Sequence, residues 1–442
     1  MIWTIVLFVI TISLLVTIHE FGHFILAKLC GVKVECFSIG FGKKLIKHTT
    51  KKGTEFSISA IPLGGYVKMA DTRVQTLSED QTHTAFDKKP IYKRALIVSA
   101  GPMANFLLAL IVYWIIFQIG VTVYPVKIEQ TFANTPASSI NIPQDAELKL
   151  IDGIKVESWK DVSKELLRKM GDNTITITYS YGENNQTETQ NIDISKWEFD
   201  VEKSSPIMAF GFKPAPIEIL PIISKVMSNS AAEKAQLEIG DRIISYNGII
   251  YKDWELFTKV VKKGNKINLV INRNGVLLQR ELTPSMIKQA NGEIIGVAGI
   301  YPSNNTTVKQ YGIVSALIKG SEQTIDTVKS IIRSFYQLIT GTLSLKNLSG
   351  PITIAQGAAQ MADYGLVPYL YFLAFISVSL GIVNLLPLPV LDGGHLLFLL
   401  IEKIKGSPLS EVKQEIFYRI GIFLLMAIMG VAIFNDFTRL SL

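Results

Sequence analysis

Cysteine is scarce in this chain: Cys30 and Cys36 are the only two among its 442 residues. They do not form a C-x-x-C pair, and they lie in a basic segment that we expect to face the cytoplasm, where thiols stay reduced. We therefore assign the two thiols no role.

Charged residues are absent from three long runs, at positions 2–18, 95–120 and 367–390. The whole chain is 48% hydrophobic, with a mean hydropathy of +0.31. An apolar run of about 20 residues spans a bilayer, and a shorter run at 420–434 predicts a fourth span. The predicted fold class is therefore a polytopic α-helical membrane protein with four transmembrane helices.

The first apolar run also lacks the marks of a cleaved signal peptide, which are a basic beginning and a small-residue cleavage site. We therefore interpret it as a retained helix. The loop that follows is basic, with 13 Lys/Arg against 6 Asp/Glu between positions 28 and 94. Such loops stay cytoplasmic. A nucleic-acid partner is not expected, because the loop lacks interleaved aromatic residues and a known binding motif.

The first run leads directly into His19-Glu20-Phe21-Gly22-His23, an H-E-x-x-H pattern within the same predicted span. On a helix, positions i and i+4 share one face, so His19 and His23 can both bind one Zn²⁺. A catalytic zinc keeps an open position for water, and Glu20 would act as the base that takes a proton from that water. Ionisable groups inside a span are costly, which makes a functional role the default interpretation.

The third run supplies the missing ligand. Its end and the residues that follow read Asn384-Leu-Leu-Pro-Leu-Pro-Val-Leu-Asp392-Gly-Gly-His395. Odd-numbered spans cross the membrane in the same direction, so this end reaches the depth of His19, which lies roughly 26 Å along the first helix. Asp392 is the predicted third ligand, and His395 is the alternative.

Within the basic loop, residues 56–61 alternate apolar and polar side chains, as a β-strand does. Gly64 and Gly65 interrupt the pattern, and residues 66–69 predict a second strand. The loop is either an ordinary small sheet or a sheet whose edge, at 56–61, pairs with an extended substrate peptide.

Residues 121–302 are polar, rich in predicted strands, and repeat at a spacing of 95 residues. Asp152-Gly153 matches Asn247-Gly248, and Trp159 matches Trp254. Two copies indicate two sister domains. The second copy resembles a PDZ domain of the bacterial protease type, while the first departs from it, with Asp145-Ala146 in place of Gly240-Asp241. The pair is expected either to bind peptides or to act as a steric filter.

The chain order is predicted as follows. The first span is 1–27, the cytoplasmic loop 28–90, the second span 91–120, the PDZ-like domains 121–215 and 216–302, an amphipathic helix with its connector 303–366, the third span 367–395, a second cytoplasmic loop 396–415, and the fourth span 416–442. The amphipathic helix is predicted from the helical spacing of Ile325, Val328 and Ile332, among others.

Together these motifs resemble the site-2 protease family over essentially the whole chain. The resemblance rests on H-E-F-G-H at 19–23, Gly101-Pro102 with Asn105 in the second span, the tandem PDZ-like copies, and N-x-x-P-x-P-x-x-D-G at 384–393. It implies that His19, His23 and Asp392 bind one zinc ion per chain and that Glu20 is the catalytic base.

The same resemblance implies the remaining roles. Asn384, Pro387 and Pro389 would shape substrate binding, and the sheet containing Phe56, Ile58, Gly64 and Gly65 would engage an unwound substrate. Enzymes of this family reside in the membrane, here the bacterial inner membrane with the PDZ-like domains in the periplasm. They cut single-pass transmembrane substrates, such as an anti-sigma factor already trimmed by another protease in the envelope stress response, and remnant signal peptides.

Two other classes remain to be weighed. A PDZ-bearing receptor with a purely structural zinc would need four ligands and no base, whereas Glu20 is present. A transporter would need more spans and a repeat within the membrane. The sequence therefore favours an intramembrane zinc endopeptidase, with the Asn384 amide as a donor to the developing oxyanion.

Overall fold

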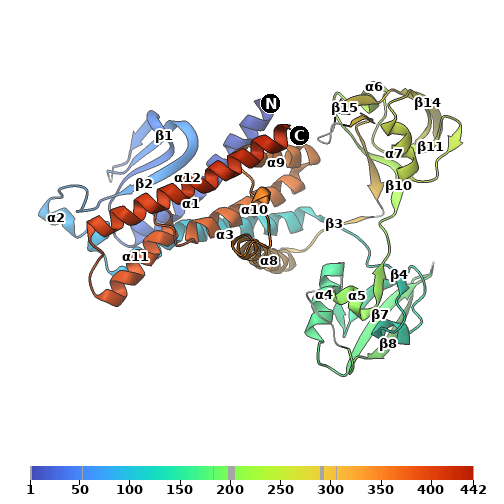
Figure 1. The fold of residues 1–442 in the computed structure, drawn as a ribbon, viewed down its shortest axis with the longest axis horizontal. Helices are drawn as coiled ribbons and strands as arrows, with labels where there is room; N and C mark the ends of the chain where they lie inside the picture. The colour runs from blue at the N-terminus through green and yellow to red at the C-terminus, as the bar shows by residue number, and fades with distance from the viewer. Residues whose placement is uncertain are drawn as a thin grey trace. The chain divides into compact units, whose positions relative to one another are not determined.

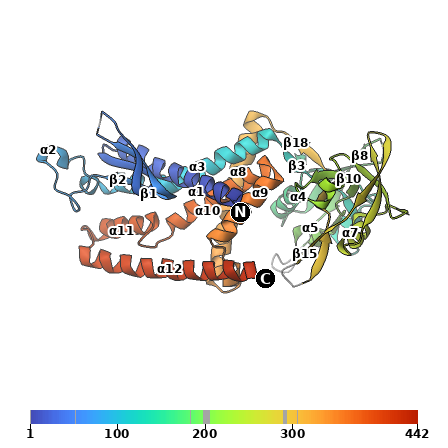
Figure 2. The ribbon, with the colours of Figure 1, turned by 90° about the horizontal axis from the view of Figure 1, so that it is seen from above.

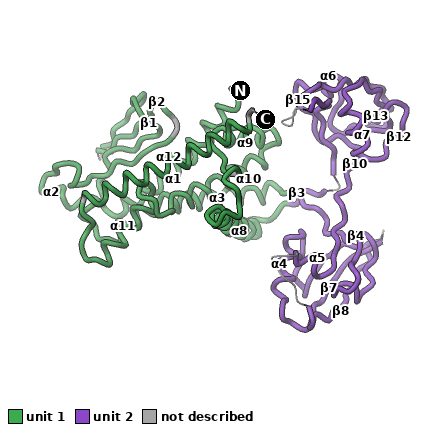
Figure 3. The backbone as a smooth tube through the Cα atoms, in the orientation of Figure 1, with its two compact units in different colours: residues 1–121, 310–441 green, residues 122–309, 442 purple. Residues whose placement is uncertain are grey.

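The computed structural model describes residues 2–51, 53–182, 184–197, 205–288, 293–304 and 306–441. The chain forms two compact units (Figure 3). The first unit contains Met1–Val121 and Gln310–Ser441, and the second contains Thr122–Lys309. The second unit is therefore an insertion into the first.

In the part of the chain that the structure describes, four helices are long and apolar enough to cross a membrane. They are α1 (Ile2–Leu29), α3 (Ile91–Ile119), α10 (Leu366–Leu385) and α12 (Glu411–Ser441) (Figure 1). They confirm the predicted fold class of a four-helix membrane protein with small antiparallel sheets.

Helix α3 contacts α1, α10 and the amphipathic helix α8 (Ile313–Ile339), so it organises the first unit. Small residues allow these close approaches. A Cβ atom on Gly22 would lie 2.3 Å from the carbonyl oxygen of Ala100, and one on Gly381 would lie 3.0 Å from the Phe106 ring. Glycine at these positions lets α1 and α10 pack against α3.

The third predicted span, 367–395, is in fact two elements. Helix α10 ends at Leu385, and a separate helix, α11, runs over Asp392–Lys405. Pro387 and Pro389 lie in the bend between them, where they cannot donate the N–H groups that would continue a helix. Asp392 is therefore the first residue of α11 rather than the end of a span.

The fourth predicted span, 416–442 with its apolar run at 420–434, corresponds to α12, which begins five residues earlier, at Glu411, and continues to Ser441. Its far end is polar yet buried: Asp436 is 1% exposed and accepts hydrogen bonds from the backbone N–H groups of Gly350, Ile352 and Thr353. These groups open α9 (Pro351–Tyr364) and have no acceptor within that helix. The Asp436 carboxylate therefore stabilises both helices.

The strands predicted at 56–61 and 66–69 form one long strand, β2 (Glu55–Met69), which pairs antiparallel with β1 (Val34–Thr49). Both strands bend, and the sheet runs in the order 44–49, 55–59, 34–39, 65–69. Gly40 and Gly42 take φ values of +87° and +85° at the bend of β1, a conformation that glycine adopts without strain. In Figures 1 and 2 this sheet lies beside α1, which it contacts.

The prediction that residues 56–61 form a sheet edge is wrong for residues 56–58, which pair with a strand on both sides. Ile58 pairs with both Ile39 and Ile46, and Ser57 pairs with both Ser38 and Lys47. Among the described residues, the outer strands of this sheet are 44–49 and 65–69. The alternating pattern of 56–61 identified a strand but did not reveal its neighbours.

The second unit contains two β-rich repeats. The first repeat consists of β4 (Ile128–Thr131), η2 (Pro136–Ser139), β5 (Glu147–Ile151), β6 (Ile154–Lys155), α4 (Trp159–Arg168), β7 (Thr174–Tyr181), β8 (Gln186–Asp193), α5 (Pro206–Phe210) and β9 (Phe212–Pro214). The second repeat consists of β10 (Ile219–Val226), α6 (Ala231–Lys234), β11 (Arg242–Tyr246), β12 (Ile249–Ile250), α7 (Trp254–Lys262), β13 (Ile267–Arg273), β14 (Val276–Leu282), β15 (Ser285–Lys288), β16 (Ile294–Val297) and β17 (Ile300–Asn304).

The repeats share one topology, since the order β6-β5-β7-β8 in the first corresponds to β12-β11-β13-β14 in the second. Each has its own buried core, with Tyr179 and Phe210 in the first and Phe257 and Leu269 in the second. The connecting strands β3 (Val121–Val123) and β18 (Thr307–Lys309) pair with each other. The remaining short helices are α2 (Glu79–Thr82), η1 (Phe86–Lys88) and η3 (Leu345–Asn347).

The register explains why the first repeat departs from the second at Asp145-Ala146. Ile151 pairs with Ile177 in the first repeat, and Tyr246 pairs with Leu269 at the same place in the second. When these two pairs are matched, Tyr181 of the first repeat corresponds to Arg273 of the second. In the second repeat Arg273 bonds twice to the fully buried Asp241, at 2.7 and 2.9 Å. In the first repeat, the corresponding pair is the buried Ala146 and the partly buried Tyr181. Where the second repeat has an ion pair, the first repeat has two uncharged residues at the corresponding positions.

Candidate active site

His19, His23 and Asp392 meet at one point, although Asp392 is more than 360 positions away in sequence. The Asp392 Oδ2 atom lies 3.2 Å from His19 Nε2 and 3.4 Å from His23 Nε2. The two Nε2 atoms are 3.2 Å apart. Both histidines are buried, at 7% and 8% exposure. The cluster contains Asp392 and not His395, whose Nδ1 instead lies 3.4 Å from the Tyr418 hydroxyl.

Local sequence brings these side chains together. His19 and His23 are one helical turn apart on α1, and Asp392 opens α11 directly after the 386–391 bend. The bend is tight: a Cβ atom on Gly393 would lie 2.2 Å from the Leu386 carbonyl oxygen, and one on Gly394 would lie 2.3 Å from that of Leu388. Only glycine lets α11 begin so close to the preceding chain.

The cluster fits a zinc ion. Four tetrahedral ligands at about 2.0–2.1 Å from zinc lie about 3.3–3.4 Å from one another, close to the three observed separations. The Asp392 Oδ2 atom is buried and has no hydrogen-bond partner within the protein. A Cβ atom on residue 101 would lie 2.2 Å from His23 Nε2, so Gly101 keeps space open beside the ligand atoms.

Helix α3 contacts the outer nitrogen of each histidine. His23 Nδ1 lies 2.8 Å from the carbonyl oxygen of Ile97, and the Asn105 side-chain nitrogen lies 3.1 Å from His19 Nδ1. The sequence alone does not distinguish these contacts from ordinary helix packing. A polar residue in an uncharged run was the one available signal for Asn105.

Glu20 lies beside the sheet. Its carboxylate lies near the backbone N–H of Val67 and interacts electrostatically with both histidines and Asp392. A Cβ atom on Gly65 would lie 3.3 Å from the Glu20 side chain. The outer strand 65–69 is therefore the part of the sheet that borders the cluster.

The other residues singled out from the sequence occupy two places. Asn384 lies in the last turn of α10, and Pro387 and Pro389 lie in the bend that leads to Asp392. Phe56 packs its ring against Phe24 and Phe37, at centroid distances of 5.5 and 5.6 Å. The Ile58 side chain is 46% exposed.

An ion pair that the sequence did not reveal ties α11 to α3. The Arg94 guanidinium donates to both carboxylate oxygens of Glu402, at 3.0 and 2.5 Å, and both side chains are mostly buried. A bidentate pair of this kind fixes orientation as well as distance. It therefore holds the helix that begins with Asp392 against the helix that contacts both histidines.

Residues 7–428 match the sequence profile of Peptidase family M50. This chain belongs to that family. The regulator of sigma E protease of Salmonella typhi and the regulator of sigma-E protease RseP of Escherichia coli (strain K12) are each 44% identical to it over 446 residues, covering 99% of either chain. A putative zinc metalloprotease of Vibrio cholerae is 41% identical over 447 residues, again covering 99% of both.

Family membership, the zinc-compatible cluster and the apolar helices together define an M50 zinc metalloprotease of the membrane. Two of the three cluster residues lie in α1, one of the four helices apolar enough to span a bilayer. The enzyme is therefore an intramembrane protease.

Proposed function

We propose that this M50 protease hydrolyses peptide bonds within the transmembrane segments of single-pass membrane proteins. The position of the metal cluster carries the proposal. Glu20 and the two histidines interrupt a helix that has no other charged residue before Lys28. Ionisable groups are costly in such a helix and mark function. A peptide bond that reaches this cluster must do so within the membrane.

The name of the Escherichia coli relative, regulator of sigma-E protease, supports one substrate class. We propose an anti-sigma factor already trimmed by another protease, acting in an envelope stress response, and remnant signal peptides as a second class. Both are single spans with little mass outside the membrane.

We assign His19, His23 and Asp392 as the ligands of one zinc ion, which leaves a fourth position open. When bound, zinc polarises the scissile carbonyl and lowers the pKa of water. Glu20 accepts a proton as the water oxygen bonds to the carbonyl carbon, and returns it to the nitrogen as the C–N bond breaks. The Asn384 amide donates to the carbonyl oxygen as negative charge develops there. Pro387 and Pro389 hold the bend that shapes this side of the site.

We further propose that the outer strand 65–69, rather than 56–61, pairs with the unwound substrate. A transmembrane helix must lose its internal hydrogen bonds before it can be cut, and an outer strand offers replacements. The strand borders Glu20, so a paired substrate would run past the base. Gly64 and Gly65 allow the close approach, and the exposed Ile58 side chain is available to substrate side chains, with Phe56 supporting the sheet from within.

The orientation that we propose places the basic residues 28–94 in the cytoplasm and the second unit in the periplasm of a bacterial inner membrane. The metal site then lies toward the cytoplasmic side of a bilayer core about 30 Å thick.

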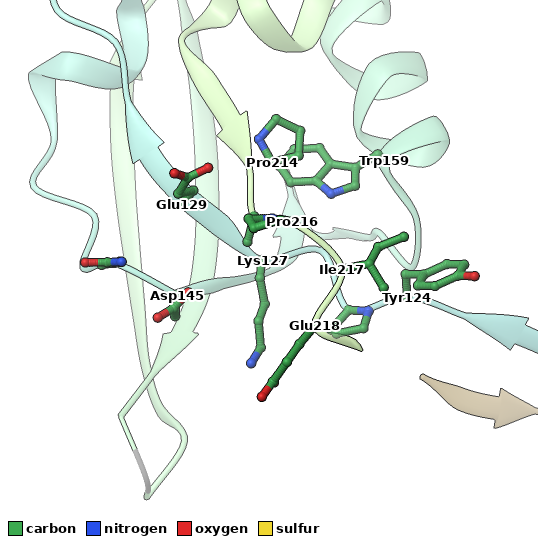
Figure 4. A pocket seen from close by; sticks show the side chains of 12 residues that line it. Tyr124, Lys127, Glu129, Asp145, Trp159, Pro214, Pro216, Ile217 and Glu218 are labelled. Carbon is green, nitrogen blue, oxygen red and sulfur yellow. The ribbon is translucent and has the colours of Figure 1, made fainter. Parts of the chain in front are cut away.

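We propose that the two repeats are PDZ domains that act as a size filter. A cavity of about 780 Å³ at the first repeat is lined by Trp159, Pro214, Lys127 and Glu218, among others (Figure 4). The cavity has apolar residues and charged residues of both signs, and this combination suits a peptide. Peptide binding is therefore the alternative role of the two repeats. Deletion of the second unit distinguishes a size filter from a peptide-binding role.

Cleavage of a single-span reporter by the purified enzyme in lipid vesicles tests the proposal. Wild type should cleave it and carry about one zinc per chain. Glu20→Gln removes the proton acceptor at nearly constant shape, so zinc should remain while cleavage stops. Substantial turnover by this variant would mean that another group is the base.

A further inference from the structure

His23 shows how α3 can prepare a histidine for a metal. Its Nδ1 lies 2.8 Å from the Ile97 carbonyl oxygen, which can only accept a hydrogen bond. The proton of neutral His23 must therefore be on Nδ1. This leaves Nε2, which faces the other two ligands, with a free electron pair for the metal.

His19 needs the same arrangement, because its Nε2 also faces the cluster. Its Nδ1 lies 3.1 Å from the side-chain nitrogen of Asn105. With that nitrogen as donor, the proton of His19 would be on Nε2 and would block the metal. The amide oxygen and nitrogen of asparagine can exchange places by a rotation of the side chain. Rotated, Asn105 would offer its oxygen to a proton on Nδ1.

The burial of Asn105 supports the rotated amide. Asn105 is 0% exposed, and its Oδ1 atom as placed has no hydrogen-bond partner. An unpaired buried oxygen is costly, and His19 Nδ1–H is the donor that removes this cost. The helix around Asn105 is also held in place, because the Ser377 hydroxyl of α10 donates to the Asn105 carbonyl oxygen at 2.8 Å.

We propose that Asn105 is a positioning residue for zinc, whose side-chain oxygen accepts the Nδ1 proton of His19 and fixes the ring with Nε2 toward the metal. Helix α3 then orients both histidines of α1, through a backbone carbonyl at Ile97 and a side chain at Asn105. The inference rests on the proposed ligand set. Removing such an outer partner costs about 10–100-fold in metal affinity.

The test measures zinc affinity directly, by competition with a chromophoric chelator on full-length enzyme stripped of metal. Asn105→Leu keeps the size but removes the acceptor, and its zinc affinity should fall about 10–100-fold. Asn105→Asp keeps an oxygen acceptor and should stay within about threefold of wild type. Thr11→Val is the matched control: Thr11 is buried in the same helix as His19 and bonds the Tyr369 hydroxyl at 2.8 Å, so its loss should leave zinc affinity unchanged.

The outcomes separate this inference from the proposed ligand set. His19→Ala is measured in parallel, and if it retained full zinc affinity, His19 would not be a ligand. If His19→Ala lost zinc while Asn105→Leu bound as tightly as wild type, the role of Asn105 alone would be refuted. Equal losses of zinc affinity in Asn105→Leu and Asn105→Asp, including failure of both to fold, would also refute this role. The loss would then come from packing around residue 105 and not from a missing hydrogen-bond acceptor.

Discussion

Gly101 leaves space for the two histidines of the metal site because it has no side chain. A Cβ atom there would lie 2.2 Å from His23 Nε2 and 2.8 Å from His19 Cε1. Real Cβ atoms do not approach other atoms so closely, and the cores of helical bundles have little room to relax. Residue 101 therefore must be glycine for both imidazole rings to reach the metal.

We accordingly expect Gly101→Ala to lower zinc affinity by roughly tenfold or more, in the range seen when a ligand loses its orienting partner. Chelator competition on the purified enzyme measures this. Gly430→Ala is the control, because a Cβ atom on Gly430 of α12 meets nothing within 4 Å. Unchanged zinc affinity in Gly101→Ala would show that the two rings can move aside without loss.

The buried pair of the second repeat makes a stability prediction. Asp241→Ala leaves the Arg273 guanidinium without its main partner. Breaking a fully buried pair costs about 3–5 kcal/mol, but Arg273 remains partly exposed, so we expect roughly 2 kcal/mol. Urea unfolding of residues 122–309 measures the loss. Adding Arg273→Tyr recreates the Ala146 and Tyr181 combination of the first repeat and should recover part of the lost free energy of unfolding. If no stability were recovered, the Ala146/Tyr181 and Asp241/Arg273 pairs would not be equivalent.

Single residues of the site differ in how far sequence could identify them. His19 and His23 were predictable because helical spacing alone puts them on one face. Asp392 required a second argument, the common direction of odd-numbered spans. Asn105, Gly101 and Arg94 act across helices that are adjacent only in the fold, and nothing in their local sequence indicates which neighbour they meet.

Strand 65–69 borders Glu20 and is the strand that we propose to pair with the substrate. The backbone N–H of Val67 lies near the Glu20 carboxylate, and Val67 belongs to an outer strand of the sheet, where proline is tolerated. Val67→Pro should therefore leave the sheet folded and zinc bound, while cleavage falls by about tenfold or more as Glu20 loses the neighbouring N–H. Reporter cleavage and zinc content are measured on the same preparation.

Ile58→Pro is the contrasting variant. Ile58 pairs on both sides, so proline there disturbs two neighbouring strands and should lower the yield of folded protein. If Val67→Pro lost zinc and yield to the same extent as Ile58→Pro, strand 65–69 would be required for folding and not specifically for the base.

Elements were predictable where one physical rule dominates. The predicted spans gave both ends of α1 and α3, and the beginning of α10, to within two residues, since length and apolarity decide a span. Strand β1 was missed, because residues 34–49 show no alternating pattern. The separate start of α11 was missed because it depends on how closely Gly393 approaches the backbone of Leu385 and Leu386. The bond from Gly350 to Asp436 was missed because the two residues are 86 positions apart.

At the scale of the whole molecule, the second unit is inserted between two segments of the first unit that contact each other. The Tyr311 N–H donates to the Phe117 carbonyl oxygen at 2.9 Å, and the Gln310 side chain donates to the Ile119 carbonyl oxygen, also at 2.9 Å. The chain thus leaves and re-enters the first unit at one place. The first unit should therefore fold when residues 124–306 are replaced by a short Gly/Ser linker that joins β3 to β18.

We expect this deletion variant to bind zinc and to cleave a small single-span reporter at the wild-type rate, because every residue of the proposed site belongs to the first unit. Reporters with a large folded domain on the side of the second unit should be cut poorly by wild type and well by the variant, as a size filter requires. Cleavage of small and large reporters is compared in the same vesicles. If the variant binds zinc but cleaves no reporter, the repeats deliver or bind substrate, and the cavity beside Trp159 becomes the place to look for it.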